Sequence, residues 1–397
     1  MACHDLGRGL VQYRHNGEAE SAEQGGEDSD FRSPLPARKD RLDGIGCLAM
    51  SNGKAQSPTI REVAKLAGVG LMTVSRVIND HPSVRPITRK KVKMAIAQLG
   101  YQQNEAALLL KGQRAKLIGL IVPDLSDAFF SSCAHTVQSI ARQHGYMTLV
   151  VSSERDSDLE VQQAELMAKR MISGLLLVSS INADDAKMRI LQHLDLPIVA
   201  FDRPLRGLHT DAVLVENRSG AEQATRHLLG HGHQRIACVG YDEGAFTVRE
   251  RVEGYTHTMR EAGLKPHVAL GLLTLEDVGR WLDGVLVSHR PPTAIFSLNH
   301  RTSGFLLRCL SDMGISIPNK IALIGFDDFD LASVVKPSLT TVAQSPVDLA
   351  RRSMHLLLDR VRNRAADGLY EPAKIMLPVR LILRDSCGVH PNPADES

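Results

Sequence analysis

The chain has 397 residues, of which 43% are hydrophobic, and its formal net charge is only +2. This length and composition exclude a single small domain or a disordered polymer and predict several domains with sizeable cores. No apolar run approaches the roughly 18 residues of a membrane-spanning helix, and the N-terminus lacks a signal-peptide pattern, so we expect a cytoplasmic protein without a membrane partner.

Residues 1–56 carry no apolar periodicity. Gly17–Asp30 is polar and acidic, and Ser33–Arg41 contains two prolines, a composition typical of disorder. We therefore predict a disordered extension and take Met50 as the expected true start, the upstream residues being an extension or a gene-start artefact. A flexible arm that contacts the binding partner of the next domain is the alternative.

Residues 59–79 have the pattern of two short amphipathic helices joined by a tight turn. Thr59 and Glu62 form a capping-box pair, and apolar residues then recur at helical spacing. Gly68 is placed to end the first helix in a left-handed conformation. This layout is typical of a DNA-binding helix-turn-helix, with a plain helical hairpin as the alternative. The residues that we expect to face outward on the second helix are Leu71, Met72, Ser75 and Arg76.

Residues 57–116 are strongly basic, with 11 Lys and Arg against 3 Asp and Glu. The rest of the chain is therefore acidic overall. The run from Arg89 to Lys93 lies beside the predicted recognition helix. A solvated lysine face is the usual explanation of such a run, but its position favours contact with DNA phosphates.

The residue identities of this region resemble the headpiece of the lactose-repressor/galactose-repressor family of bacterial transcription regulators. The match includes Ala64, Gly68 and Asn79, and it continues through a third helix to Asn104. Gly70 stands where the family usually has a serine, which removes a hydroxyl that could reach a phosphate. The resemblance implies a headpiece over residues 57–103 that contacts double-stranded operator DNA. Its DNA-contacting residues would be Thr59, Leu71, Met72, Thr73, Ser75, Arg76, Asn79 and Tyr101.

A leucine-rich segment follows the headpiece. Its length is too short for a stable isolated helix, so residues 104–115 would become ordered only with a partner or DNA. In the family that the chain resembles, this segment is a hinge helix that pairs in the minor groove, where an inserted leucine kinks DNA. A linker packed on the core is the alternative. The hinge residues that the resemblance assigns to DNA are Asn104, Ala107, Leu110 and Lys111.

From Lys116 the sequence alternates short apolar runs with helical segments, which predicts doubly wound parallel sheets. The fold class that we expect is a small all-α helix-turn-helix headpiece followed by an α/β core of two such lobes, resembling the periplasmic-binding-protein-like core of the same family. We assign one lobe to residues 116–215 and 342–374, the other to residues 216–341 and 375–388, and a tail to residues 389–397. The predicted strands are Leu117–Val122, Met147–Val151, Gly174–Val178, Ile198–Phe201, Ala212–Val215, Ile236–Gly240, Ala294–Ser297, Ile321–Phe326 and Ile375–Leu383.

Ligands of such folds bind at the carboxyl ends of the strands, between the lobes. The candidate effector-binding residues there are Phe129, Asp202, Arg251, Asn299 and Asp327. Carboxylates, an amide and an aromatic face suit a polyhydroxylated ligand, although helix caps, ion pairs or core packing would also explain each residue. His300 replaces the acid that usually follows Asn299 in the family, which places a pH-sensitive donor at the rim. Arg249 beside Arg251 leaves a sugar acid and a neutral sugar both open.

No motif predicts catalysis, a metal or a cofactor. The sequence has no phosphate-binding G-x-x-x-x-G-K-[ST], nucleophile elbow or G-x-G-x-x-G. The six cysteines form no C-x-x-C pair. His227, His231 and His233 have a spacing that can suit zinc, but Gly230 and Gly232 end the helix there. A helix-to-strand turn is therefore the better interpretation.

We therefore predict a non-enzymatic, homodimeric regulator that binds pseudo-palindromic operator DNA in the bacterial cytoplasm, associated with the nucleoid. Its expected role is repression, modulated by a small sugar or sugar acid bound between the lobes. A nucleobase or a phosphorylated protein as the effector is an alternative, and a sugar-binding receptor without a regulatory role is another. The sequence leaves the effector, the operator and the sign of the response open.

Overall fold

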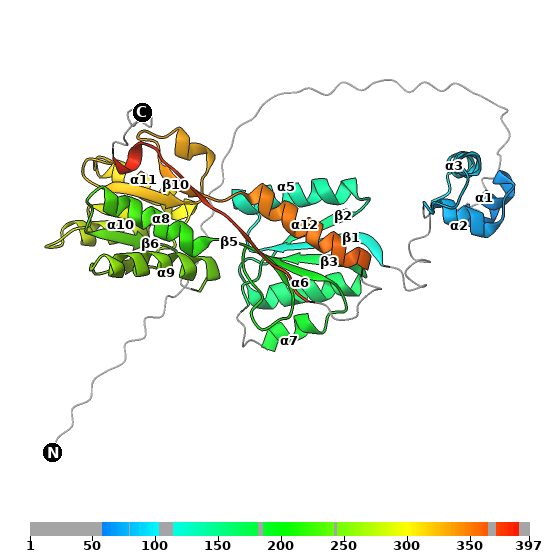
Figure 1. Cartoon of the computed structure of the whole chain (residues 1–397), viewed down its shortest axis with the longest axis horizontal. Coiled ribbons are helices and arrows are strands. Elements are labelled where there is room, and N and C mark those ends of the chain that lie inside the picture. Colours follow the sequence, from blue (N-terminus) through cyan, green and yellow to red (C-terminus); the bar gives the residue numbers. More distant parts are fainter. Residues whose placement is uncertain are drawn as a thin grey trace, which may run out of the picture. The chain divides into compact units, whose positions relative to one another are not determined.

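The computed structural model describes residues 58–78, 80–102, 114–181, 186–241, 244–363 and 371–388. They belong to two compact units, one ending at Tyr101 and the other following it (Figure 1). The predictions for residues 1–56, for the 389–397 tail, and for Asn79, Asn104, Ala107, Leu110 and Lys111 lie outside these described residues. Within the described parts, no helix is long and apolar enough to cross a membrane.

The first unit consists of three helices, α1 (Ile60–Ala67), α2 (Leu71–Ile78) and α3 (Pro86–Leu99). The predicted capping box is confirmed: Thr59 N donates to Glu62 Oε2 at 2.6 Å, and Glu62 N donates to Thr59 Oγ1 at 3.4 Å. Gly68 ends α1 with a φ of 65°, a conformation that costs glycine little. Val63, Val74 and Val92 lie in the core between the three helices. The helix-turn-helix layout that the sequence predicts is therefore present.

The first lobe of the second unit is a six-stranded sheet in the order β11-β5-β4-β3-β1-β2. Helices α5 and α12 cover one face and α6 and α7 the other, which gives the sheet two separate apolar cores. All the strand pairs are parallel, so both faces must be covered by helices. The elements are β1 (Ala115–Val122), α5 (Ala128–Gln143), β2 (Met147–Ser152), α6 (Ser157–Lys169), β3 (Ile172–Leu177), α7 (Ala186–Gln192), β4 (Ile198–Phe201), β5 (Asp211–Val215), α12 (Pro346–Asn363) and β11 (Lys374–Leu377).

The second lobe repeats this plan with the strand order β12-β10-β9-β8-β6-β7. Helices α8 and α9 pack on the face that shares the largest core cluster, and α10 and α11 pack on the other face. The elements are α8 (Asn217–Gly230), β6 (Ile236–Val239), α9 (Phe246–Glu261), β7 (His267–Ala269), α10 (Leu275–Leu286), β8 (Ala294–Ser297), α11 (His300–Asp312), β9 (Ala322–Phe326), η1 (Asp330–Ser333), β10 (Thr340–Ala343), β12 (Arg380–Ile382) and η3 (Asp385–Cys387).

The chain crosses between the lobes three times: after β5, between β10 and α12, and between β11 and β12. The single strand predicted over Ile375–Leu383 is wrong. It is two strands, β11 parallel to β5 in the first sheet and β12 antiparallel to β10 in the second. The lobe boundaries shift accordingly, because β10 belongs to the second lobe and β11 to the first. An apolar run does not reveal a change of pairing partner within it.

Candidate effector site and DNA-reading surface

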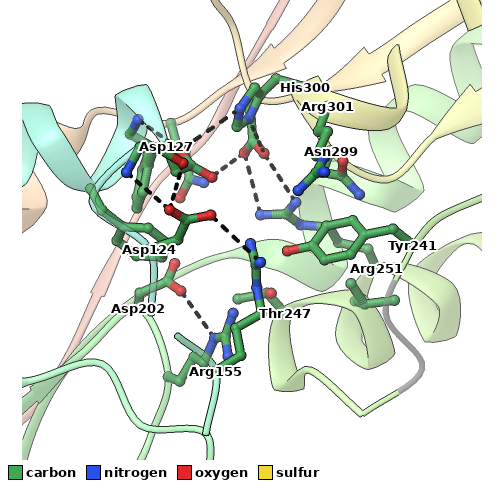
Figure 2. Close-up of a pocket in the computed structure, with 17 residues that line it drawn as sticks. Asp124, Asp127, Arg155, Asp202, Tyr241, Thr247, Arg251, Asn299, His300 and Arg301 are labelled. Carbon is green, nitrogen blue, oxygen red and sulfur yellow. Dashed lines mark hydrogen bonds and ion pairs between the residues drawn. The ribbon is translucent and has the colours of Figure 1, made fainter. Parts of the chain in front are cut away.

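A cavity of about 300 Å³ lies between the two lobes of the core (Figure 2). All five candidate residues line it. Phe129 lies in the first turn of α5 and Asp202 follows β4, whereas Arg251 lies on α9, Asn299 follows β8 and Asp327 follows β9. The sequence placed these residues at strand ends or helix starts of two different lobes, and the fold brings them to one cleft.

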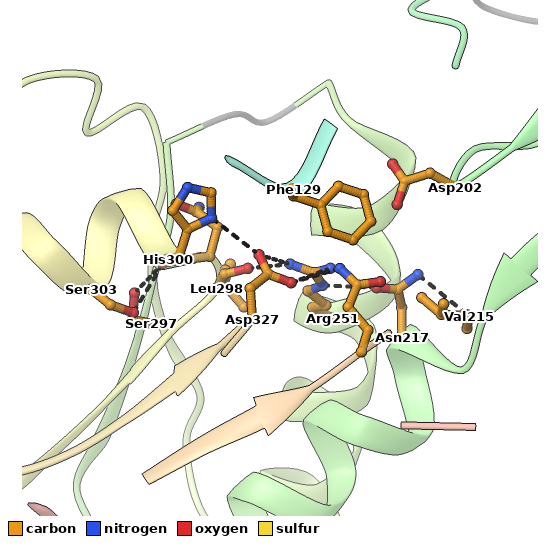
Figure 3. Close-up of polar contacts among 12 residues, drawn as sticks. Phe129, Asp202, Val215, Asn217, Arg251, Ser297, Leu298, His300, Ser303 and Asp327 are labelled. Atoms are coloured by element: carbon orange, nitrogen blue, oxygen red, sulfur yellow. Dashed lines mark hydrogen bonds and ion pairs between the residues drawn. The ribbon is translucent and has the colours of Figure 1, made fainter. Parts of the chain in front are cut away.

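Arg251 is the best-anchored side chain of the cavity. Its Nε donates to Asn217 Oδ1 at 2.8 Å and its Nη1 to the Leu298 carbonyl at 2.6 Å (Figure 3). The guanidinium also stacks over the Phe326 ring, with Cζ 3.6 Å from the ring centroid. Its acidic partner is Asp327, at 3.4 Å. Arg251 is therefore held in one orientation before any ligand arrives.

Asp327 is the carboxylate at the centre of this network. It has a left-handed φ of 70°, accepts a hydrogen bond from Gln344 Nε2 at 2.7 Å and lies 3.7 Å from His300 Nδ1. Burial by itself would raise the pKa of Asp327. Arg251, His300 and Gln344 together outweigh it and lower the pKa to about 2. Asp327 is thus an ionised acceptor at neutral pH.

Asp202 and Asn299 differ in how their polar atoms are used. Asp202 also has a left-handed φ, 65°, and its pKa is raised by burial against the opposing charges of Arg203 and Arg251. Asn299 Oδ1 accepts from Thr302 N at 2.9 Å and so caps α11. Its Nδ2 is buried without a hydrogen-bond partner, as is Gln344 Oε1. Buried polar atoms without partners are costly, so both atoms are suited to a ligand.

His300 connects the two lobes. Its Nε2 lies 3.7 Å from Asp127 Oδ1 of the first lobe and its Nδ1 lies 3.7 Å from Asp327 Oδ2 of the second (Figure 2). The facing carboxylate of Asp327 raises the pKa of His300, against the opposing effect of burial, and the charge of Asp127 adds to the increase. The sequence indicated a titratable donor at this rim but did not indicate its partner in the other lobe.

The site also contains residues that the sequence did not single out. Asp127 caps α5 through Phe129 N at 2.9 Å, a role that its position before an apolar helix could have suggested. Gln344 follows β10 in the second crossover, and Arg155 and Tyr241 follow strands β2 and β6. Arg155 and Tyr241 follow predicted strands, so their positions in the sequence could have suggested them.

The three histidines whose spacing can suit zinc lie at the end of α8. The rings of His227 and His231 are 4.7 Å apart, and Cys387 Sγ is 3.4 Å from His227 Nε2. His233 instead contacts Thr293 Oγ1 at 3.1 Å. Among the described residues, no group of three His, Cys, Asp or Glu side chains is arranged to hold a metal ion.

The outer face of α2 is exposed as the helical spacing predicts. Met72 is 71% exposed and Leu71 is 46% exposed, and Arg76 is exposed as well, while Thr73 and Ser75 are half-buried. Thr59 is exposed, but its hydroxyl is engaged in the capping box. This face therefore offers one long cation and two flexible apolar side chains, the types that read guanine edges and thymine methyls.

The basic run on α3 is divided by the fold. Arg89 bonds Asp80 at 2.7 Å and the His81 carbonyl at 2.7 Å, so it ties α3 to the loop after α2. Lys90, Lys91 and Lys93 are exposed. The three lysines are therefore the exposed cations of this run, and Arg89 has a structural role.

A helix-turn-helix unit followed by two doubly wound lobes with a cleft between them is the architecture of DNA-binding transcription regulators with a periplasmic-binding-protein-like core. Residues 59–104 match the family described as "Bacterial regulatory proteins, lacI family", and residues 115–383 match "Periplasmic binding proteins and sugar binding domain of LacI family". The chain belongs to the LacI family of bacterial transcription regulators.

Relatives with assigned names support this membership. The chain is 31% identical to the HTH-type transcriptional regulator DegA of Bacillus subtilis, over 83% of this chain and 97% of the relative. It is 30% identical to the HTH-type transcriptional repressor PurR of Haemophilus influenzae, over 83% and 98%. These relatives are regulators and not enzymes, in agreement with the class that the sequence predicts.

Solved structures agree on the fold. The transcriptional regulator CelR–cellobiose complex is 29% identical with a TM-score of 0.61, covering 83% of this chain and 99% of that one. The lac repressor dimer bound to operator is 24% identical with a TM-score of 0.72, covering 84% and 100%. At 24% identity, the similarity to the lac repressor dimer supports the fold only.

Proposed function

We propose that this chain is a homodimeric repressor that binds pseudo-palindromic operator DNA in the bacterial cytoplasm. We further propose that a sugar or sugar acid in the cleft between the lobes modulates its operator affinity. The observation that carries the effector proposal is the arrangement of Arg251, Asp327, Asn299 and Gln344 around one cavity. Each of them presents a fixed donor or acceptor.

The hydrogen-bonding capacity of the cavity suits hydroxyl groups. A hydroxyl donates one hydrogen bond and accepts others, so it can bond an ionised carboxylate such as Asp327 and a guanidinium such as Arg251 at the same time. Asn299 Nδ2 and Gln344 Oε1 add an unpartnered donor and an unpartnered acceptor. Phe129, packed edge-on against Phe130 at 5.2 Å, provides an aromatic surface for the C–H face of a sugar ring.

A nucleobase is the second candidate effector, because several relatives are named PurR. Phe129 and Tyr241 both line the cavity and could stack on a planar ring. Four carboxylates and four guanidinium groups in the same lining offer more charge than a neutral base requires, and this favours the polyol. A phosphorylated protein partner stays a prediction without support from this cleft.

The test is a thermal-shift screen of the full chain against sugars, sugar acids, phosphosugars and purines. DNA that the protein selects from a random pool then serves as the operator. The affinity of the protein for this DNA is measured with and without each compound that raises the melting temperature. We expect a sugar or sugar acid to bind and to change DNA affinity. Binding by purines alone would overturn the carbohydrate proposal, and a bound sugar without effect on DNA affinity would overturn its role as effector.

A further inference from the structure

A second, smaller cavity of about 190 Å³ adjoins the effector cavity. The two share Arg155 and Arg203 in their linings. The side cavity is otherwise lined by Arg206, Arg249 and a serine pair, with apolar and backbone groups completing it. Because a water molecule occupies roughly 30 Å³ in the liquid, the space is large enough for more than one isolated water.

The side cavity gathers four arginines, two of which contact an aspartate. Arg155 contacts Asp124 at 3.6 Å and Arg203 contacts Asp202 at 3.5 Å. Arg206 stacks on the Phe246 ring and Arg249 donates to the Gly244 carbonyl at 2.7 Å. Neither of these last two forms an ion pair with an acid in the parts of the chain that the structure describes.

The buried carboxylate that bonds Ser179 and Ser180 is that of Glu160. Both oxygens of Glu160 are occupied, one by the Ser179 hydroxyl and the other by Ser180 N at 2.9 Å. Glu160 itself is fully buried and lies outside the cavity lining. It therefore holds the serine loop in place from outside the cavity lining, where its negative charge also attracts Arg203.

Three buried polar atoms of the cavity lining have no hydrogen-bond partner in the structure. They are Arg155 Nε, Arg203 Nε and Ser180 Oγ. Arg203 is only 6% exposed as a residue, and its Nε lies 3.5 Å from Asp202 Oδ2 as an ion pair without a hydrogen bond. Two of the atoms are guanidinium N–H donors and the third is a hydroxyl that can also donate. An unpartnered buried guanidinium donor is expensive unless an acceptor reaches it, and an anionic acceptor forms the stronger bond.

We infer that the side cavity is an anion subsite of the effector cleft, and that the effector is a sugar that carries a carboxylate or phosphate. The inference rests on the proposed function, because the polyol would occupy the main cavity while its charged end reaches past Arg155 and Arg203. Arg203 and Arg155 would donate to the anion from the first lobe, and Arg249 would approach from α9 of the second lobe. The charged group therefore contacts both lobes, as the polyol does.

The test uses the full chain, its Arg206→Gln/Arg249→Gln variant and a matched control, Arg142→Gln/Arg290→Gln. The control removes one exposed arginine from each lobe outside either cavity lining. Inorganic phosphate is titrated by thermal shift against chloride at equal ionic strength. Glucose, gluconate and glucose 6-phosphate, and the corresponding galactose series, are titrated by calorimetry.

We expect phosphate to stabilise the wild type and the control saturably and to lose about tenfold or more in apparent affinity in the cavity variant, because one charged hydrogen bond corresponds to roughly that factor. A charged sugar should bind more tightly than its neutral parent only where Arg206 and Arg249 are intact. Phosphate stabilisation that survives in the cavity variant would identify an adventitious surface anion and overturn the subsite.

The two proposals can fail separately. If neutral sugars bind and neither free phosphate nor charged sugars bind better than chloride controls, the anion subsite is wrong and the carbohydrate effector stands. If phosphate binds in a manner that depends on Arg206 and Arg249 but no sugar binds in either series, the subsite is supported and the carbohydrate proposal is weakened for these two sugar skeletons.

Discussion

At the scale of single residues, Arg76 carries the clearest expectation for DNA. It is the exposed cation of α2, and an arginine that bonds O6 and N7 of a guanine contributes about 1–3 kcal/mol of discrimination. We expect Arg76→Ala to relax specificity at one guanine of each half-site while other positions keep their preference. A binding array of operator variants measures this. Uniform weakening across the array would show that Arg76 contacts phosphate only.

His300 gives the molecule a predicted pH dependence. Its pKa is raised above the ordinary 6.5 in the folded state, so its stabilising contacts with Asp127 and Asp327 are fully present below about pH 6.5 and are lost as the pH rises through the folded value. Arg251 also faces this ring and opposes its protonation. We expect the melting temperature of the wild type to exceed that of His300→Gln at low pH, and the difference to shrink as the pH increases.

The measurement is the difference in melting temperature between the two proteins from about pH 5.5 to pH 8.5, a range that includes ordinary histidine titration. His257→Gln is the control, because His257 is an exposed histidine on α9 that pairs with Glu261 within its own helix. A wild-type advantage that stays constant over the range would mean that His300 acts through packing and not through its charge.

At the scale of elements, the packing of α8 against α9 depends on one glycine. A Cβ atom at Gly254 would lie 2.3 Å from the backbone oxygen of Arg218, so an alanine there forces the two helices apart. Overpacking of this kind costs roughly 1–3 kcal/mol. We expect Gly254→Ala to lower the free energy of unfolding by at least that amount in urea.

Gly284→Ala is the matched control on α10, since a Cβ atom there meets no atom within 4 Å. Alanine is favoured over glycine in helices by up to about 1 kcal/mol, so this variant should be neutral or more stable. If both variants lost stability equally, backbone effects and not the α8–α9 contact would be the cause.

The elements also show what sequence patterns could and could not predict. The headpiece helices follow from local signals, because Thr59, Glu62 and Gly68 set their limits through contacts with near neighbours. The eight strands predicted between Leu117 and Phe326 are present, since buried parallel strands appear as continuous apolar runs. Strand β7 has only three residues and half-exposed or exposed side chains, so it carries no such signal.

The sequence predicts where the candidate site lies, but it does not predict which of its residues contact one another. Strand ends and helix starts indicated all five predicted residues that line the cavity. The contacts of Arg251 with Asn217, and of His300 with Asp127, join residues far apart in the sequence or in different lobes. Such pairs depend on how the lobes pack, and a single sequence does not encode them in any local pattern.

At the scale of the whole molecule, one headpiece supplies one recognition helix. A pseudo-palindromic site requires two at a fixed spacing, so the proposed operator binding implies a two-fold assembly. We expect a dimer by light scattering at micromolar concentration, and a tetramer would contradict this expectation.

At the same scale, effector binding and operator binding are expected to be coupled. The two lobes are joined by three crossovers, and a ligand between them can bind both. A ligand that contacts Asp327 of one lobe and Asp202 of the other binds the closed arrangement more tightly and shifts the population toward it. If closure alters operator affinity by some factor, operator must alter effector affinity by the same factor. The two factors must be equal whether the effector increases or decreases operator affinity.

We expect Asp327→Ala to abolish the effector response while the operator affinity measured without effector stays nearly unchanged. The reason is that Asp327 meets Arg251, Gln344 and His300 inside the cleft and belongs to the unit separate from the headpiece. Operator titrations with and without effector, and effector titrations with and without operator, measure both sides of the cycle in the wild type and the variant. Loss of operator binding by Asp327→Ala, with an unchanged circular dichroism spectrum, would assign Asp327 to the scaffold of its lobe and not to the effector pocket.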